Sequence, residues 1–132
     1  MAFLIDSDWV IDYLDQRPEA LELFTSFGNE GVYVSIVTYM EVFQGTLREA
    51  DATRARDTLN RFLDSAPLLP FSQNVAERCA RIREAVRGGR VRTNRRAFDL
   101  MIAATAIEHG LTLVTRNVDD FADVPELVLH RP

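Results

Sequence analysis

Short apolar runs alternate along this chain with stretches that carry apolar residues at helical spacing, and this alternation constrains the fold most strongly. The runs have the length and aliphatic composition of buried strands, and they lie at residues 3–5, 32–34, 67–70, 111–114 and 127–129. Strands that alternate with helices form parallel sheets, because each crossover returns the chain to the same end of the sheet. The pattern therefore predicts an α/β fold with a central, mostly parallel sheet of four to five strands and helices on both faces.

Helices are expected between these runs. They are predicted at residues 8–14, 21–27, 38–45 and 48–62, from Ser72 or Asn74 to about 87, and at 96–109. Gly28 and Gly110 follow two of them, as is usual where a helix ends in the left-handed conformation. The chain has 132 residues, of which 47% are hydrophobic, and it shows no repeat or linker. We therefore expect one domain over residues 1–132.

Basic residues are unevenly distributed. All 15 are arginines, the net charge is -5, and eight arginines fall between residues 78 and 96, where Glu84 is the only acid. An acidic chain argues against a general nucleic-acid coat protein, whose whole surface would be basic. The local concentration predicts either a patch that binds a polyanion or a solvated helix face followed by an arginine-rich loop.

The sequence lacks the features of exported, disulfide-bonded and membrane-spanning chains. Cys79 is the only cysteine, so we expect a buried thiol, with neither an intrachain disulfide nor a cysteine zinc cluster. The segment from Met1 to Asp6 has no basic part and soon meets an acid, unlike a signal peptide. No apolar run approaches the roughly 18 residues of a membrane span. We therefore expect a cytoplasmic protein that does not contact membranes.

Acidic residues follow a strand or begin a helix in three separate segments. Asp6 directly follows the first apolar run, Glu41 is expected in the first turn of the helix after the second, and Asp99 in the first turn of the last helix. The carboxyl ends of parallel strands meet at one edge of a sheet, where α/β proteins bind their ligands. Polar residues after the fourth run should reach the same edge: Thr115, Arg116, Asn117, Asp119 and Asp120.

Carboxylates that converge in this way repel one another unless a cation neutralises them. Oxygen ligands suit Mg²⁺ or Mn²⁺, which can polarise a phosphoryl oxygen and lower the pKa of a water molecule. Each acid also has a structural interpretation: Thr38 and Glu41 match a capping box, Asp99 complements a helix dipole, and Asp6 can cap a helix. All three acids are expected at the same edge of the sheet, and this shared position favours the metal-site interpretation.

At four segments the sequence resembles the PIN-domain nucleases, and among them the VapC-type toxins of bacterial toxin–antitoxin pairs. The segments are residues 3–11 with Asp6, residues 34–45 with Glu41, residues 98–106 with Asp99, and residues 113–121 followed by Val124-Pro125. They occur in the family's order and span nearly the whole chain. The resemblance implies a single three-layer α/β/α PIN-like domain.

It also implies a Mg²⁺- or Mn²⁺-dependent endoribonuclease. Asp6 and Asp99 would bind the metal directly, and Glu41 would bind it directly or through a water molecule. Thr115 would place its hydroxyl near the metal.

The fourth acidic position of the family pattern falls two residues after Thr115, on Asn117. Asp119 or Asp120 would replace it. An asparagine at this position favours one tightly held metal ion in the free enzyme, with a second recruited together with RNA.

The arginines gain a specific role from this resemblance. Five of them border the expected metal site and are predicted to contact RNA phosphates: Arg90, Arg92, Arg95, Arg96 and Arg116. Such contacts position a substrate without specifying its sequence. The resemblance further implies a VapB-like antitoxin, which would block the acidic pocket and cover apolar grooves, and a homodimer.

Two other functions compete with the nuclease. A degenerate PIN domain would bind RNA or a protein without cutting RNA, and Asn117 keeps this hypothesis open. A receiver-like domain would accept a phosphoryl group, but such domains place a lysine beside the phosphate and this chain has none. Among the aromatic residues, Trp9, Tyr13 and Phe43 are expected in the core or in an interface rather than as platforms for bases.

Overall fold

The computed structural model describes residues 1–89 and 92–131. In chain order the elements are β1 (Ala2–Ile5), α1 (Ser7–Leu14), α2 (Pro18–Ser26), β2 (Gly31–Ser35), α3 (Ile36–Thr46), α4 (Ala52–Leu63), β3 (Leu68–Leu69), α5 (Gln73–Ala85), the 3₁₀ turn η1 (Thr93–Arg96), α6 (Ala97–Glu108), β4 (Thr112–Val114) and the 3₁₀ turn η2 (Val118–Phe121). The alternation of strands and helices predicted from the apolar runs is confirmed.

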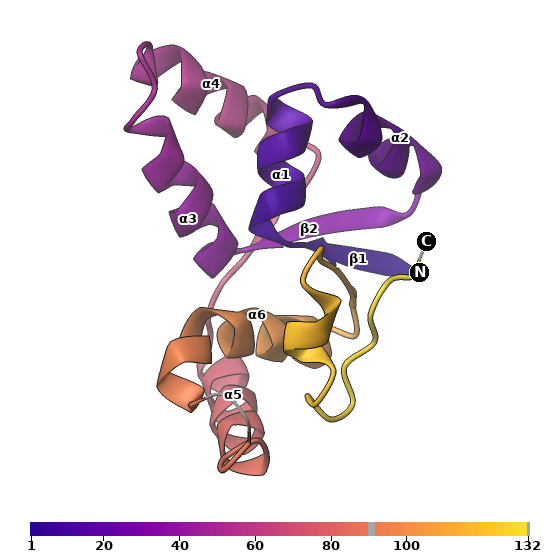
Figure 1. Ribbon diagram of the computed structural model, residues 1–132. Helices are drawn as coiled ribbons and strands as arrows, with labels where there is room; N and C mark the ends of the chain where they lie inside the picture. The colour runs from indigo at the N-terminus through magenta and orange to yellow at the C-terminus, as the bar shows by residue number, and fades with distance from the viewer. Residues whose placement is uncertain (90–91, 132) are drawn as a thin grey trace.

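The four strands form one parallel sheet in the order β3-β2-β1-β4. β1 lies at its centre, where Leu4 is paired with Tyr33 of β2 and with Leu113 of β4. Figure 1 shows β1 and β2 running side by side in the same direction, with α1 and α3 leaving from the same end of the sheet. All strand ends that carry candidate site residues therefore point the same way.

Each face of the sheet is covered by helices, which confirms the three-layer α/β/α fold. Alternate residues of β1 face opposite sides, so Phe3 and Ile5 join one core cluster and Leu4 joins the other. Helices α1 to α4 cover the first face, and α5 and α6 cover the second (Figure 1). Cys79 of α5 is buried in the second cluster as a free thiol, as expected.

Helix α6 is apolar on almost every side because it is enclosed by neighbouring elements. It packs against α5, α3 and β4, and its small residues Ala103, Ala104 and Ala106 are fully buried. Within the described part of the chain, none of the helices is both long and apolar enough to traverse a bilayer.

The strand expected at residues 127–129 is wrong. Within the described residues this segment forms one isolated parallel bridge, between Leu129 and Leu113. Two backbone hydrogen bonds flank that bridge, from Leu113 N to Val128 O and from His130 N to Leu113 O. β4 is only three residues long, so it offers the passing chain too short an edge to extend the pairing.

Three helix starts also differ from the sequence expectation. α2 begins at Pro18 rather than at residue 21, because proline suits the first turn of a helix. α4 begins at Ala52 rather than near Arg48, because the Asp51 side chain caps it by accepting a hydrogen bond from Arg54 N. α3 begins at Ile36, where Ser35 is the cap and accepts a hydrogen bond from Thr38 N. The expected capping box of Thr38 and Glu41 is therefore wrong, and Glu41 lies in the second turn of α3.

Candidate functional site

Asp6 joins the ends of two strands and the start of a helix. Its Oδ1 accepts a hydrogen bond from the Ser7 backbone N at 2.8 Å, which caps α1, and its Oδ2 accepts one from the Thr115 hydroxyl at 2.7 Å. Its own backbone N donates to Val114 O at 2.9 Å. Only 5% of Asp6 is exposed. The predicted capping role of Asp6 is thus confirmed. The capping carboxylate lies at the edge of the sheet where β1 ends.

The three expected acids influence one another electrostatically. Burial raises the pKa of Glu41, and the neighbouring charges of Asp6 and Asp99 raise it further. Burial likewise raises the pKa of Asp99, followed by the charges of Asp6 and Asp120. The pKa of Asp6 is raised by burial, although the Thr115 hydroxyl opposes the shift. Carboxylates from β1, α3, α6 and the segment after β4 therefore share one environment in which negative charge is unfavourable.

This donor set fits a hard divalent cation in its chemistry, because all of its ligand atoms are carboxylate oxygens whose repulsion a cation would relieve. Among residues 1–89 and 92–131, however, no group of three or more His, Cys, Asp or Glu side chains is already gathered as a metal-binding cluster. The charges of Asp6 and Asp99 nevertheless act on Glu41, so these carboxylates are electrostatic neighbours.

The segment after β4 places its polar residues differently. Thr115 is buried against Asp6, and its oxygen accepts a hydrogen bond from Asn117 N at 3.1 Å. Asn117 is exposed. Asp119 and Asp120 line a pocket of about 480 Å³ together with Asp99. Of the alternatives for the fourth acidic position, Asp120 is the one whose charge raises the pKa of Asp99.

Arg95 is an exposed arginine beside the acids. It lines two hollows that it shares with Asp99, one of which also contains Glu41. Arg92 is exposed just before the η1 turn. Arg90, also expected to contact RNA, lies outside the described residues.

Arg96 borders the same pocket as Asp99, but its guanidinium is held by the protein. Only 8% of it is exposed, and its guanidinium donates two hydrogen bonds to the Asp123 carboxylate, at 2.7 and 2.8 Å. It donates a third, at 2.8 Å, to the Asp120 carbonyl oxygen. Because its donors are directed inward, Arg96 ties the start of α6 to the η2 segment, and its contact with RNA phosphates stays a prediction.

Arg116 is likewise held by the protein. Its guanidinium lies 3.8 Å from the centre of the Trp9 ring, and it forms ion pairs with Asp12 and Glu19. These contacts fasten the residue next to Thr115 onto α1 and α2. The phosphate contact expected of Arg116 stays a prediction, and two carboxylates compete for its charge.

The family model described as PIN domain matches residues 3–127 of this chain. The chain belongs to the PIN-domain family. The acids described above, Asp6, Glu41, Asp99 and Asp120, all lie within the matched residues.

Two curated proteins and one solved structure illustrate this similarity. Ribonuclease VapC2 of Rickettsia felis is 25% identical over 135 residues, which cover 98% of this chain and 97% of the relative. The tRNA(fMet)-specific endonuclease VapC of Salmonella typhimurium is 25% identical over 126 residues, covering 95% and 93%. A toxin–antitoxin complex from Klebsiella pneumoniae contains a chain with 30% identity and a TM-score of 0.73, with 96% of each chain covered.

Two residues of this PIN domain were not foreseen as part of its site. The Ser7 hydroxyl lowers the pKa of both Asp6 and Glu41. Its position directly after Asp6 was the available signal. Asp123, which holds Arg96, gave no such signal, because the partners are 27 residues apart and meet only through the fold.

Proposed function

We propose that this PIN domain is a metal-dependent endoribonuclease that hydrolyses RNA phosphodiester bonds with Mg²⁺ or Mn²⁺. The observation that carries the proposal is that the charge of the buried Asp6 raises the pKa values of both Glu41 and Asp99, and that the charge of Asp99 also raises that of Glu41. Perturbed acids at the carboxyl edge of a parallel sheet are a frequent mark of catalytic sites. The names of the two curated relatives, a ribonuclease and a tRNA-specific endonuclease, support the same reaction.

Asp6 and Asp99 would hold the ion directly, and Glu41 would hold it directly or through water. Asp120 would fill the fourth acidic position in place of Asn117, because its charge already acts on Asp99. When bound, the divalent ion supplies a Lewis acid at the phosphoryl group.

The remaining residues orient this set and the substrate. The Thr115 hydroxyl donates to Asp6 and thereby fixes the direction of one carboxylate. The Ser7 hydroxyl lowers the pKa values of Asp6 and Glu41 and so favours the charged forms that would bind the ion. Arg95, with Arg92 beyond it, would contact substrate phosphates at the rim, where exposed guanidinium groups remain accessible to a polyanion.

Cleavage of single-stranded RNA with Mn²⁺ or Mg²⁺ tests the proposal. The parent should cut, and Asp6→Asn and Asp99→Asn should each lower kcat at least ~100-fold, because each removes one carboxylate of the metal-binding set. Asp57→Asn, at an exposed position on α4, is the matched control and should cut like the parent. Variants that cut as fast as the parent after rigorous purification would refute the proposal, and RNA binding without cleavage by the parent would favour a degenerate PIN domain.

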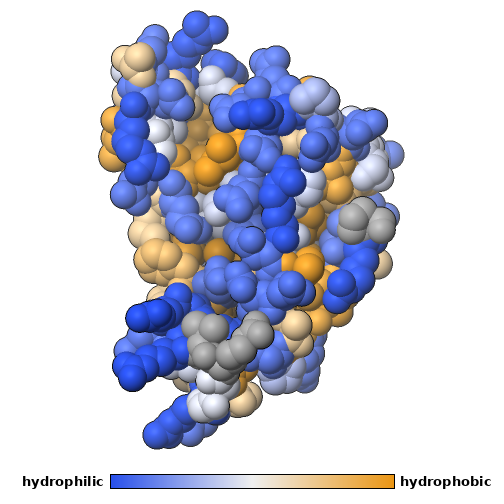
Figure 2. Space-filling model, viewed as in Figure 1, coloured by the Kyte–Doolittle hydropathy of each residue, from blue (hydrophilic) through white to orange (hydrophobic). Residues whose placement is uncertain are grey.

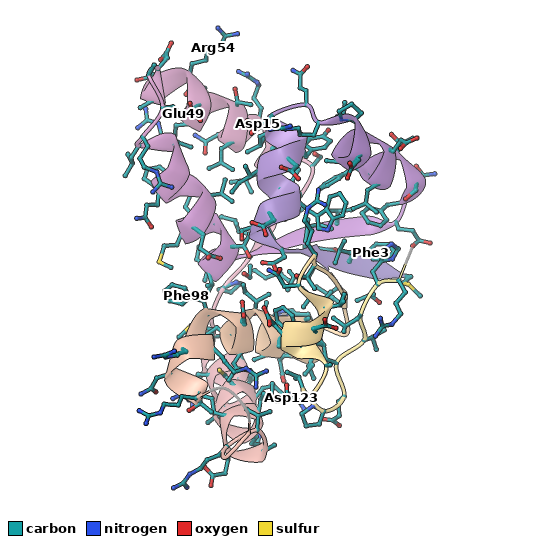
Figure 3. All side chains as sticks on the ribbon, viewed as in Figure 1. Phe3, Asp15, Glu49, Arg54, Phe98 and Asp123 are labelled. Carbon is teal, nitrogen blue, oxygen red and sulfur yellow. The ribbon has the colours of Figure 1, made fainter. Side chains whose placement is uncertain are left out.

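We further propose that the chain is the toxin of a pair with a VapB-like antitoxin. The structural neighbour from Klebsiella pneumoniae is a toxin–antitoxin complex. In this chain a hollow of about 570 Å³ lies between α1, α3 and α4 and offers a surface to a partner. Figure 2 shows apolar surface there, surrounded by hydrophilic residues, and Figure 3 shows Asp15, Glu49 and Arg54 around it.

Growth measurements separate this partner proposal from the nuclease proposal. Induction of the chain alone should arrest bacterial growth, and Asp99→Asn should abolish the arrest. Co-expression of a small DNA-binding protein encoded beside the gene should restore growth and form a stable complex with the chain. Absence of any such complex would refute the pairing while leaving the nuclease intact. The homodimer implied by the family resemblance is part of the proposal, and light scattering measures it.

A further inference from the structure

Phe98 is an exposed aromatic residue that the proposed function leaves unexplained. It directly precedes Asp99 in the first turn of α6, yet 49% of it is accessible to solvent. Among the described residues it is the only aromatic one in the set of exposed large hydrophobic residues. Trp9, Tyr13 and Phe43, by contrast, pack against the core cluster that contains Phe3. Single exposed apolar residues are common on protein surfaces, so what borders the Phe98 ring decides whether it can serve a ligand.

The surroundings of Phe98 combine an aromatic surface with charges suited to a nucleotide. A hollow of about 280 Å³ is lined by Glu41, Asn94, Arg95, Ala97, Phe98 and Asp99. Figure 3 shows Phe98 between the start of α6 and the start of α3, at the outer border of the site. The ring, an exposed guanidinium and two of the metal-site carboxylates therefore border one space.

We propose that Phe98 forms a stacking platform for an unpaired base next to the scissile phosphate of RNA. This inference rests on the proposed nuclease function and names the form of its substrate. A phosphate placed at Asp99 brings the neighbouring base to the same hollow, where the exposed ring can cover one of its faces. Arg95 lies on that wall and can contact the adjacent phosphate.

The chemistry of stacking determines what this subsite selects. Every base has a π-face, so an aromatic platform tolerates different sequences. A base within a duplex is already stacked and paired, and it cannot lie on Phe98 without leaving the helix. The subsite therefore favours single-stranded segments, loops and bulges over duplexes and contributes little to the choice among the four bases.

Fluorescence of a single-stranded oligoribonucleotide that contains 2-aminopurine tests the platform. In EDTA, to prevent cleavage, the parent should quench the fluorescence, and Phe98→Ala should weaken binding roughly 5- to 150-fold. Phe98→Tyr should restore most of the affinity, because tyrosine keeps the aromatic face. Leu47→Ala is the matched control, since Leu47 is an exposed apolar residue at the opposite end of α3. In Mn²⁺, Phe98→Ala should raise KM more than it lowers kcat.

Three results would overturn the platform. Equal binding and cleavage by the parent and Phe98→Ala would leave the nuclease standing and remove the subsite. Equal loss in Phe98→Tyr and Phe98→Ala would mean that the aromatic face is not what is recognised. Light scattering that shows a dimer for the parent and a monomer for Phe98→Ala would place the ring between two copies of the chain. A parent that neither binds nor cuts RNA would overturn both the platform and the proposed function.

Discussion

Replacing Arg96 with methionine removes a buried cation while keeping most of the side-chain volume. Arg96 joins the start of α6 to the η2 segment through two hydrogen bonds to Asp123 and one to the Asp120 carbonyl oxygen. The pKa of Arg96 is raised, first because of its hydrogen bonds to Asp123. The substitution therefore removes the donors for two acceptor groups on a segment that borders the metal site.

The size of the effect follows from the burial of each partner. Breaking a fully buried ion pair by removing one member costs about 3–5 kcal/mol. Here the Asp123 side chain is 49% exposed, so water can solvate its carboxylate once the guanidinium is gone. The loss should therefore be somewhat smaller than for a fully buried ion pair, and we expect the free energy of unfolding to fall by about 2–3 kcal/mol. For a domain of this size that corresponds to a Tm lower by roughly 10 °C.

Urea unfolding followed by circular dichroism measures this loss. Arg87→Met is the matched control, because its ion pair with Glu84 is exposed on both sides and should contribute less than about 0.5 kcal/mol. Arg96→Lys keeps the charge but not the planar double contact, and it should fall between the parent and Arg96→Met. If Arg96→Met loses no more stability than Arg87→Met, the inward placement of Arg96 is refuted.

Two further predictions concern the acids themselves. Thr115→Val removes the hydroxyl that donates to Asp6, so it should lower kcat roughly 10-fold and the free energy of unfolding by about 1–2 kcal/mol. Unchanged cleavage would contradict the role of Thr115 in orienting Asp6. In EDTA, the folded-state pKa values of Asp6, Glu41 and Asp99 lie above their ordinary values of 3.8, 4.5 and 3.8, so the folded protein binds these protons more tightly than the unfolded chain. The contribution of these groups to stability should therefore increase as pH falls through the raised pKa values toward the ordinary ones. At neutral pH, Asp99→Asn should raise Tm. A lower Tm for this variant would contradict the repulsion among the carboxylates.

The general arrangement of the fold could be predicted because it depends on local patterns. The apolar run before Asp6 forms β1, and the Asp6 side chain ends it by capping α1. The edge shared by Asp6, Glu41 and Asp99 follows from parallel strands, whose carboxyl ends meet. The family motifs were needed to select these three acids as candidate metal ligands, because each of them also has an ordinary structural role when considered alone.

What sequence patterns could not predict depends on which distant segments meet. The arginines near residue 96 look equivalent in sequence, yet Arg95 is exposed beside the acids and Arg96 is buried against Asp123. Residues 127–129 have strand-like composition, but they pass a β4 strand too short to pair with them further. Phe98 lies in the first turn of α6 among apolar residues, and no local pattern distinguishes it from its buried neighbours, yet 49% of it is exposed.

Calorimetric titration of the metal-free chain with Mn²⁺ tests most directly whether the acids of four segments form one cation site. We expect the parent to bind Mn²⁺ and Asp99→Asn to lose most of that affinity, while Asp57→Asn binds as the parent does. Binding should also raise Tm, because the cation relieves the repulsion seen in the raised pKa values of Glu41 and Asp99. A parent that binds no Mn²⁺, or an Asp99→Asn variant that binds it equally well, would contradict the account.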